Sequence, residues 1–373
     1  MSDPTFWRAG DDPGRRQFVT FDHGGRGVDL EGGAHLASVT IAYETWGRLD
    51  ARASNAVLVL HALTGDSHVA GAAGPAHPTP GWWDGLVGPG RALDTDRYFV
   101  VCPNVLGGCQ GTTGPSSLAP DGRPYGSRFP VVTIRDQVAV ETALADHLGV
   151  ARFAAVVGGS MGAMRALEWA LGYPERVARA VVLAAGAAGT ADQIALCSLQ
   201  VRAIRADPHY AGGDYYGGSA PRTGLAIARG IGQFSYRTWT EFEERFGREP
   251  QDDRAVLDGG RYAIESYLRY QGEKLAARFD PNSYVVLSEA MNHHDVGRGR
   301  GGVVAALKSV RVPVTVAGVS SDRLYPRELQ EELARLIPRA GLVKVITSPA
   351  GHDGFLIEAD QVAGIVADAL ADR

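Results

Sequence analysis

The sequence predicts an α/β fold with a mainly parallel sheet flanked by helices. Short apolar runs at residues 57–60, 98–102, 153–157 and 180–183 are bounded by turn residues, as buried strands are. Between the second and third runs, residues 136–148 place apolar side chains at helical spacing. The alternation resumes near the C-terminus, with apolar runs at 312–316 and 342–346 and a helical stretch at 360–370. Strands that alternate with helices form parallel sheets covered on both faces.

The region between these two series of strands has a different pattern. Residues 220–231, 238–246 and 261–279 are helical in character, with no convincing buried strand between them. We therefore predict one core, formed by residues 1–190 and 303–373, and a helical insertion, residues 191–302. Aromatic side chains are frequent in the insertion, and they suit a core, a groove or a subunit contact equally well. They are Tyr210, Tyr215, Tyr216, Phe234, Tyr236, Trp239, Phe242 and Phe246.

Composition excludes several classes of function. The 373 residues carry a formal net charge of -5, without a basic patch for nucleic acid or an acidic membrane surface. No window approaches 18 consecutive apolar residues, and the first residues lack the apolar segment of a signal peptide. Three cysteines without regular spacing fit a reducing compartment. The sequence predicts a soluble cytoplasmic protein that binds neither nucleic acid nor membrane.

A G-x-S-x-G motif follows the third strand. Residues 158–162 read Gly-Gly-Ser-Met-Gly, and strong helix formers come directly after them. In a sharp strand-to-helix turn, small residues let the two backbones approach and the serine hydroxyl is presented at the end of the sheet. We predict that Ser160 is a nucleophile. The alternative is a tight turn with a structural use only.

A serine nucleophile needs a base, and the base needs an orienting acid. In the α/β-hydrolase fold these partners follow the serine in the order acid, then histidine, each on the loop after a later strand. Asp322 follows the run at 312–316, and His352 follows the run at 342–346 between glycines. Asp353 and Asp295 are rivals for the acid, but Asp353 adjoins the histidine and Asp295 belongs to the insertion. We predict a Ser160, His352 and Asp322 triad.

Acyl transfer also needs hydrogen-bond donors for the developing oxyanion. The residue after the nucleophile supplies one, the backbone N–H of Met161. The second should come from the loop after the first strand, where we choose Leu63. A leucine that merely packs at the end of a strand is the alternative for Leu63.

The sequence gives little support for a nucleotide-binding or metal-binding site. There is no Gly-Lys pair of a phosphate loop, and no G-x-G-x-x-G motif follows the first strand. Residues 293–295 read His-His-Asp, but adjacent side chains on a helix point apart and no third ligand follows four residues on. We predict no metal and no bound cofactor.

These residues and their surroundings resemble the homoserine O-acetyltransferase family, an acyl-transferring branch of the α/β-hydrolase fold. The resemblance covers most of the chain from residue 42 onward. The matching stretches are residues 62–68, 82–84, 104–115, 158–169, 224–229 and 279–284, together with the Asp322 and His352 loops. The stretches at 104–115 and 158–169 are specific, because simple esterases lack them.

The resemblance implies transfer of an acetyl group from acetyl-CoA to the hydroxyl of L-homoserine, by way of an acyl group on Ser160. It further implies that Arg229 and Asp353 meet the amino-acid substrate, that Tyr236 lies near them, and that the insertion is a lid that forms a homodimer contact. An arginine fork suits a carboxylate and an aspartate suits an ammonium group, which together recognise a zwitterion. The family often has Gly where Ala163 stands and His where Gln233 stands.

Other functions remain open from the sequence. Homoserine O-succinyltransferase and serine O-acyltransferase activities arise in related sequences, and a few side chains in the pocket could separate them. A carboxylic-ester hydrolase would turn over esters without an acceptor. A non-catalytic binding protein is disfavoured because all three triad positions hold competent residues.

Overall fold

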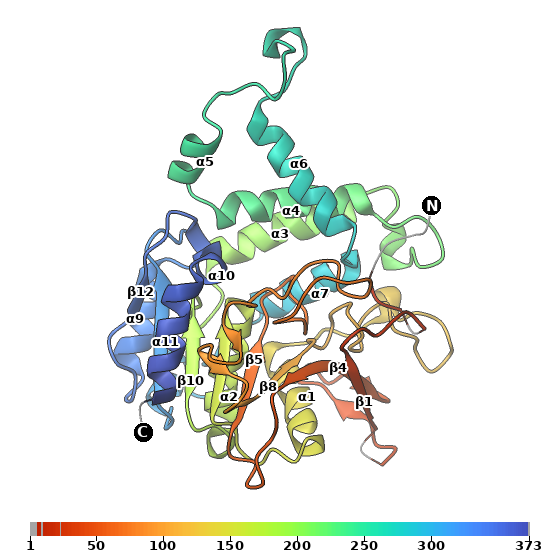
Figure 1. Cartoon of the computed structure of the whole chain (residues 1–373). Helices are drawn as coiled ribbons and strands as arrows, with labels where there is room; N and C mark the ends of the chain where they lie inside the picture. The colour runs from red at the N-terminus through yellow and green to blue at the C-terminus, as the bar shows by residue number, and fades with distance from the viewer. Residues whose placement is uncertain (1–5, 9, 23, 372–373) are drawn as a thin grey trace.

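An eight-stranded sheet forms the centre of the computed structural model, which describes residues 6–8, 10–22 and 24–371 (Figure 1). β1 pairs antiparallel with β4, and β4 pairs antiparallel with β8, whereas all later neighbours are parallel. The prediction of a mainly parallel sheet is confirmed. In spatial order the strands are β1 (Gln17–Phe21), β4 (Val39–Trp46), β8 (Phe99–Pro103), β5 (Ala56–Leu60), β9 (Ala155–Gly159), β10 (Ala180–Leu183), β11 (Val314–Val319) and β12 (Lys344–Ile346).

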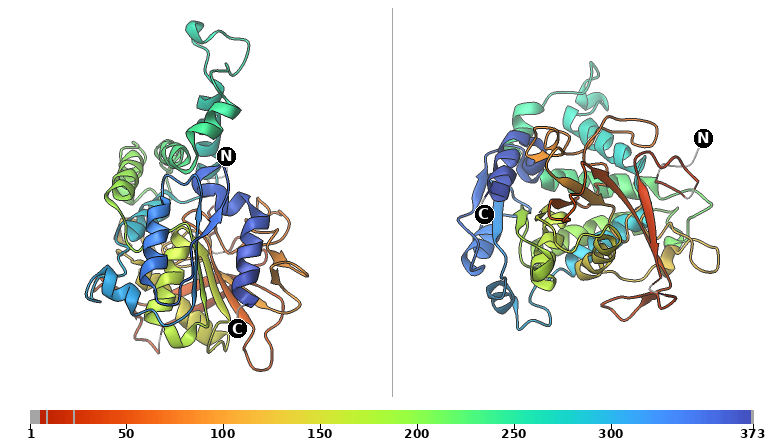
Figure 2. Two further views of the ribbon diagram at one scale, coloured as in Figure 1. Left: turned by 90° about the vertical axis from the view of Figure 1, so that its left-hand side faces the viewer. Right: turned by 60° about the horizontal axis from the view of Figure 1, so that its bottom comes forward.

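Helices cover both faces of the sheet (Figure 2). Along β5, Leu58 and Leu60 pack into one apolar cluster and Val57 and Val59 into another, as expected when successive side chains alternate between faces. The first cluster includes side chains of α1 (Ile134–His147), α2 (Met161–Gly172) and α9 (Arg327–Leu336). The second includes α11 (Ala359–Ala371). Burial on both faces explains the continuous apolar runs in the sequence.

Local capping sets the start of α1. The Thr133 hydroxyl accepts a hydrogen bond from Asp136 N, and the Asp136 carboxylate accepts one from Thr133 N at 2.8 Å. This reciprocal capping box contributes about 1 kcal/mol to helix stability. It places the first helical residue at Ile134, two residues earlier than the spacing of apolar side chains predicts.

The described residues of the insertion, 191–302, contribute no strand to the main sheet. α3 and α4 pack against each other across one end of the sheet, while α5 and the start of α6 project away from the core (Figure 1). α7 differs from them, because its Tyr284 and Leu287 are fully buried in the main apolar cluster. The insertion contains α3 (Ala191–Arg205), α4 (Arg222–Tyr236), α5 (Trp239–Arg245), α6 (Ala263–Ala276) and α7 (Pro281–Asn292).

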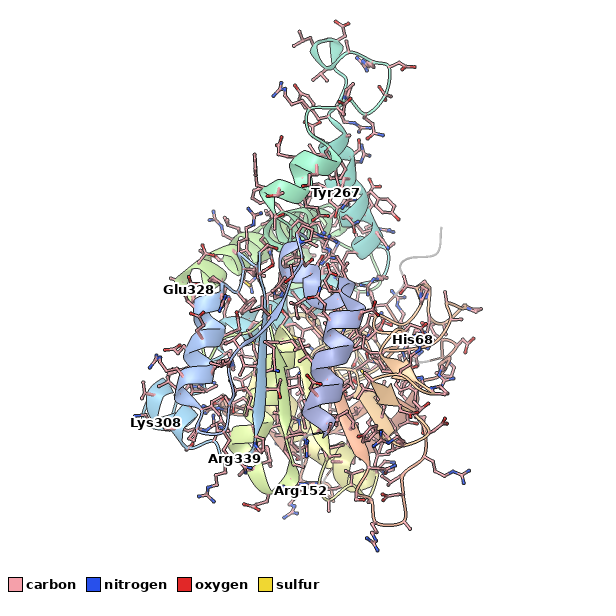
Figure 3. All side chains as sticks on the ribbon, turned by 60° about the vertical axis from the view of Figure 1, so that its left-hand side comes forward. His68, Arg152, Tyr267, Lys308, Glu328 and Arg339 are labelled. Carbon is pink, nitrogen blue, oxygen red and sulfur yellow. The ribbon has the colours of Figure 1, made fainter. Side chains whose placement is uncertain are left out.

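The aromatic side chains of the insertion serve different purposes. Tyr215 is buried, whereas Phe234 and Trp239 are 54% and 73% exposed. Phe242 and Phe246 each contact the ring of Tyr267 on α6, at the base of the projecting segment (Figure 3). Part of this aromatic content therefore forms a small satellite core, and part faces outward.

Further short elements lie near the sheet. β2 (Val28–Asp29) pairs with β3 (His35–Leu36), and β6 (Val87–Gly88) pairs with β7 (Leu93–Asp94). α8 (Val303–Lys308) precedes β11, and α10 (Gly354–Ile357) precedes α11. Among the described helices, none is both long and apolar enough to cross a membrane. The first five residues, part of the segment that lacks a signal-peptide pattern, lie outside the described residues.

Candidate active site

Ser160 lies in the turn from β9 to α2 with a strained backbone. Its φ of 56° and ψ of -123° are conformations that side chains other than glycine rarely adopt. The neighbouring glycines make the turn possible, because a Cβ on Gly158 would lie 2.2 Å from the Gly162 carbonyl oxygen and one on Gly162 2.0 Å from the Leu60 oxygen. The motif therefore folds into the sharp elbow that the sequence predicts.

His352 connects Ser160 to Asp322. His352 Nε2 lies 2.9 Å from Ser160 Oγ, and His352 Nδ1 lies 2.6 Å from Asp322 Oδ2. The other Asp322 oxygen accepts hydrogen bonds from the backbone N–H groups of Leu324 and Tyr325, both at 2.9 Å. Asp322 follows β11 and His352 follows β12, so the structure brings together three loops that are far apart in the sequence.

The surroundings of His352 control its charge. Burial lowers the pKa of His352, but the Asp322 carboxylate outweighs burial through its charge and hydrogen bond, and Asp353 adds to it. The pKa of His352 is therefore raised above its usual value. The ring of Tyr325 stacks against the imidazole with centroids 5.0 Å apart, and Phe355 contacts it edge-on. These contacts hold the imidazole plane between serine and aspartate.

A cavity of about 120 Å³ opens onto Ser160 and His352. Leu63, Arg229, Tyr236 and Asp353 line it as well, so six of the eight site residues predicted from the sequence face one space. Of the other two, Met161 directly follows Ser160 in the chain, and Asp322 contacts His352 Nδ1. Within the described chain, the backbone N–H groups of Leu63 and Met161 donate no hydrogen bond. Both donors are thus free for a group bound beside Ser160.

Arg229 and Tyr236 come from α4, which reaches over the cavity. The Arg229 guanidinium lies 5.3 Å from the centre of the Tyr236 ring, a cation–π distance. The Tyr236 ring in turn lies 6.0 Å from the His352 ring. Arg229 therefore supplies positive charge to the cavity close to the imidazole.

Asp353 is already paired within the chain. Its Oδ2 lies 3.1 Å from Arg237 Nε, and Arg237 also contacts Glu241 at 3.0 Å. Asp353 makes no contact with His352 of the kind that Asp322 makes. The other rival for the acid, Asp295, accepts a hydrogen bond from Gly297 N in its own loop.

Several residues of the cavity were missed by reasoning from the sequence. Gln193, at the start of α3, caps its own helix through Thr190 and donates a hydrogen bond to the Leu324 carbonyl at 2.7 Å. It thereby ties the insertion to the loop of Asp322. A threonine followed three residues later by glutamine predicts a helix start, but it gives no signal of this second contact.

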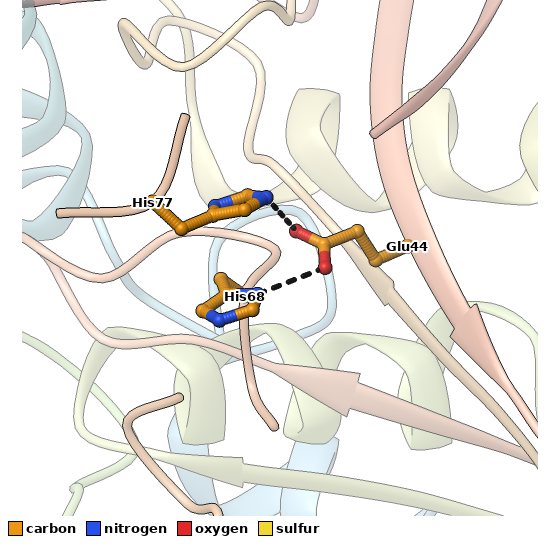
Figure 4. A group of neighbouring side chains, drawn as sticks. All are labelled: Glu44, His68 and His77. Atoms are coloured by element: carbon orange, nitrogen blue, oxygen red, sulfur yellow. Dashed lines mark hydrogen bonds and ion pairs between the residues drawn. The ribbon is translucent and has the colours of Figure 1, made fainter. Parts of the chain in front are cut away.

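Three buried side chains outside the cavity form a cluster that could be considered for a metal (Figure 4). His68 Nδ1 lies 3.0 Å from one Glu44 oxygen, and His77 Nε2 lies 3.6 Å from the other. The two imidazole rings are stacked, 3.9 Å apart and 11° from parallel. A ring nitrogen binds a metal in its ring plane, so parallel stacked rings do not direct two nitrogens at one ion. Glu44 also accepts a hydrogen bond from Ser67 Oγ at 2.8 Å and lies 3.8 Å from the Arg15 guanidinium. The cluster fits a hydrogen-bonded network better than a metal site.

Comparisons with known proteins agree with this architecture. The alpha/beta hydrolase fold family matches residues 55–359. A homoserine O-acetyltransferase of Thermobifida fusca is 60% identical over 367 residues, which cover 98% of this chain and 96% of the relative. The crystal structure of homoserine O-acetyltransferase from Bacillus anthracis superposes with a TM-score of 0.87 at 27% identity, covering 96% of this chain and 98% of that one. Esterase E22 superposes equally well, with a TM-score of 0.86 at 28% identity, covering 95% and 99%.

The matched family and the parallel sheet with its serine elbow define an α/β hydrolase-fold protein. The fold does not separate acyl transfer from ester hydrolysis, because an esterase and an acetyltransferase share it with this chain. Sequence identity over nearly the whole length does separate them. The chain belongs to the homoserine O-acetyltransferase family.

Proposed function

We propose that this protein transfers an acetyl group from acetyl-CoA to the hydroxyl of L-homoserine and forms O-acetyl-L-homoserine for methionine biosynthesis. The observation that carries the proposal is the hydrogen-bonded series from Ser160 through His352 to Asp322, which opens on a cavity with a cation and a carboxylate. Family membership at 60% identity supports the choice of donor and acceptor.

In the first half-reaction, Ser160 Oγ attacks the thioester carbonyl carbon while His352 Nε2 takes its proton. Asp322 stabilises the imidazolium that forms. The negative oxygen of the tetrahedral intermediate accepts hydrogen bonds from the N–H groups of Leu63 and Met161, and loss of one such donor typically costs about 10²- to 10³-fold in rate. The carbon–sulfur bond then breaks, and His352 returns the proton to the CoA thiolate.

In the second half-reaction, the hydroxyl of homoserine gives its proton to His352 and attacks the acetyl-serine carbonyl. Collapse of the second intermediate releases the acetylated product and returns the proton to Ser160. Water competes for the acyl-enzyme, so the acceptor must be held in attack geometry, where effective molarities reach about 10⁵ M or more. A small cavity closed by α3 and α4 meets this need.

Charge recognition of the acceptor is assigned to Arg229 and Asp353. Arg229 would pair with the homoserine carboxylate, and Asp353 with its ammonium group. Arg237 already contacts Asp353 at 3.1 Å, so the substrate ammonium would share this carboxylate with a cation of the chain. Sharing keeps the Asp353 side chain in one orientation before the substrate arrives.

The assignment is tested by combining acetyl-CoA or succinyl-CoA with homoserine or serine. Free thiol and the mass of the amino-acid product are followed together. We expect thiol release that depends on homoserine and a product heavier by one acetyl group, and we expect Ser160→Ala to abolish both. Preference for succinyl-CoA or for serine would replace the substrate while keeping the mechanism. Full turnover by Ser160→Ala would contradict the nucleophile.

Ester hydrolysis is the second candidate, because esterase E22 shares this fold closely. It predicts thiol release from acetyl-CoA, or turnover of simple esters, at a rate independent of homoserine. The same assay without acceptor separates the two functions.

We also infer a cytoplasmic homodimer. All three cysteines, Cys102, Cys109 and Cys197, are free thiols, which fits a reducing compartment. α4 and α6 form an exposed groove lined by Ile227 and Leu268, and Trp239 stands exposed nearby on α5. Apolar surface gathered on one projecting region is typical of a subunit contact.

A further inference from the structure

The two donors that face the developing oxyanion belong to different parts of the fold. Met161 is the first residue of α2, and Leu63 lies in the loop after β5. Both N–H groups must lie about 2.7–3.1 Å from the same oxygen to act together. Their separation therefore depends on whatever joins α2 to the loop after β5.

One fully buried arginine makes this connection. Arg165 lies on α2 one turn after Met161, and its side chain has no exposed surface. Arg165 Nη2 donates to the carbonyl oxygen of His61 at 2.5 Å, and Nη1 pairs with Glu141 Oε1 on α1 at 2.6 Å. The second Glu141 oxygen accepts a hydrogen bond from Trp169 Nε1 at 2.8 Å. Two side chains of α2 therefore contact the Glu141 carboxylate. Glu141 in turn orients the Arg165 guanidinium, which donates to the His61 carbonyl at the end of β5.

His61 carries the connection to Leu63. Val105 N donates to His61 Nε2 at 3.1 Å, so this nitrogen is unprotonated and the hydrogen is on Nδ1. His61 Nδ1 therefore donates to the Ala62 carbonyl at 2.8 Å, and Gly65 N donates to the same oxygen at 2.9 Å. In a planar trans peptide the C=O and the following N–H point in opposite directions. Two donors on the Ala62 oxygen thus fix the direction of the Leu63 N–H.

The backbone contact beneath these side chains supports the same connection. A Cβ on Gly162 would lie 2.0 Å from the Leu60 oxygen and 3.0 Å from the His61 oxygen, so α2 rests directly on the end of β5. Burial and the charge of Arg165 lower the pKa of His61 to about 3, which keeps the ring neutral and its tautomer constant. α2 and the end of β5 are therefore connected by both backbone and side-chain contacts.

We propose that Arg165 is a positioning residue that sets the separation of the two oxyanion donors, acting through the His61 carbonyl and imidazole. The proposal rests on the acyl-serine mechanism given above. Arg165 does not touch the substrate, yet it would contribute to stabilisation of the transition state through the two donors. Changing Arg165 should therefore change kcat without a matching change in KM.

The test uses two variants of the full-length protein. Arg165→Lys keeps a positive charge for Glu141, but one ammonium cannot hold both partners as the guanidinium fork does. The double variant Arg165→Met with Glu141→Gln removes both charges together, and the glutamine still provides an acceptor for Trp169. Both members are replaced because this is far less disruptive than removing one member of a buried pair. Arg300→Met is the matched control, since Arg300 pairs with Glu168 on the same helix at 2.7 Å and touches no part of the loop after β5.

We expect both Arg165 variants to lower kcat about 10- to 100-fold, below the loss of a whole donor, with KM for acetyl-CoA changed less than about threefold. Arg300→Met should lower the melting temperature while keeping kcat near the wild-type value. Wild-type kcat in either folded Arg165 variant would overturn the proposal. Equal losses of kcat in Arg300→Met would overturn it as well, because they would assign the effect to general destabilisation.

A second readout separates this inference from the identity of the acceptor. The rate at which p-nitrophenyl acetate acylates Ser160 depends on the oxyanion donors and needs neither CoA nor homoserine. We expect the Arg165 variants to slow this acylation by the same factor as kcat. If wild-type protein is acylated but transfers nothing to homoserine, the proposed acceptor is wrong, and the role of Arg165 is still decided by the acylation rates.

Discussion

The charge of His352 is set by burial and by two neighbouring carboxylates, which have opposing effects. Burial disfavours the imidazolium, whereas Asp322 and, more weakly, Asp353 favour it, and the net result is a raised pKa. As a general base His352 must be neutral. Activity should therefore rise with pH through this raised pKa, on the acidic limb of the profile.

Removing the charge of Asp353 should move this limb. Because Asp353 raises the pKa of His352, Asp353→Asn is expected to shift the acidic limb of kcat/KM for acetyl-CoA toward lower pH. The donor half-reaction is measured, since homoserine binding is itself assigned to Asp353. Asp360→Asn, on the exposed side of α11, is the control. An unchanged limb in Asp353→Asn would show that Asp353 has no effect on the imidazole.

At the scale of elements, the parts of the site that the sequence predicts are those that follow strands. Ser160, Asp322 and His352 each come after an apolar run, and the carboxyl ends of parallel strands meet at one end of a sheet. β1 and β4 were missed, because neither has a continuous apolar run. β1 lies at the sheet edge and is partly exposed, and β4 carries threonine and glutamate side chains among its apolar ones.

Contacts between the insertion and the loops of Asp322 and His352 could not be predicted from the sequence either. Thr238 donates to the Pro349 carbonyl at 2.6 Å, and Arg323 donates to the Ser235 carbonyl at 3.3 Å. Gly351 has a φ of 65° and lies so close to α4 that a Cβ on it would be 2.3 Å from the backbone carbonyl oxygen of Tyr236. Such contacts join residues about 90 to 115 positions apart, and no local pattern marks them. They couple the helices above the cavity to the loops of the acid and the base.

The contact between α2 and β5 gives a prediction at this scale. Gly162→Ala would place a methyl group 2.0 Å from the Leu60 oxygen, so α2 must move away from β5. We expect a loss of about 1–3 kcal/mol in the free energy of unfolding, as for other overpacked sites, together with a fall in kcat. Gly364→Ala, in the open interior of α11, should instead raise stability by up to about 1 kcal/mol and leave kcat unchanged. Chemical denaturation and thiol-release kinetics measure both effects, and a wild-type kcat in Gly162→Ala would contradict the close contact.

For the whole molecule, the projecting segment predicts how two chains associate. Trp239 is 73% exposed on α5, and burying such an aromatic side chain is typical of a subunit contact. We expect the wild-type protein to have twice the 39.5 kDa mass of one chain in light scattering. Trp239→Glu should shift it toward the monomer. Leu342→Glu is the matched control, because Leu342 is 91% exposed on the surface of the α/β domain, away from the insertion. Equal masses for the two variants would place the contact elsewhere.

The dependence of stability on pH follows from histidines that the fold buries without charge. Burial lowers the pKa of His294 to about 4, and burial with Arg165 lowers that of His61 to about 3, against 6.5 for an ordinary histidine. Below pH 6.5 the unfolded chain binds protons that the folded chain does not, so stability falls as pH falls, by up to about 1.4 kcal/mol per pH unit for each such histidine. The raised pKa of His352 has the opposite sign, but it acts above pH 6.5 and does not change this window.

Urea unfolding between pH 6.5 and 5 tests this expectation. As pH falls across this range, His61 and His294 should lower the free energy of unfolding of the wild-type protein, against the opposing contribution of the buried Glu141 and Asp280 carboxyls, whose pKa values are raised. His294→Gln keeps an amide that can donate to the Gly186 carbonyl, which His294 Nε2 contacts at 3.3 Å. Because the variant lacks the contribution of His294, its free energy of unfolding should rise relative to that of the wild-type protein as pH falls. Above pH 7 the difference between the two proteins should be constant, because neither state of His294 then gains a proton. Parallel curves from pH 8 to pH 5 would mean that His294 is as easily protonated in the folded protein as in the unfolded chain.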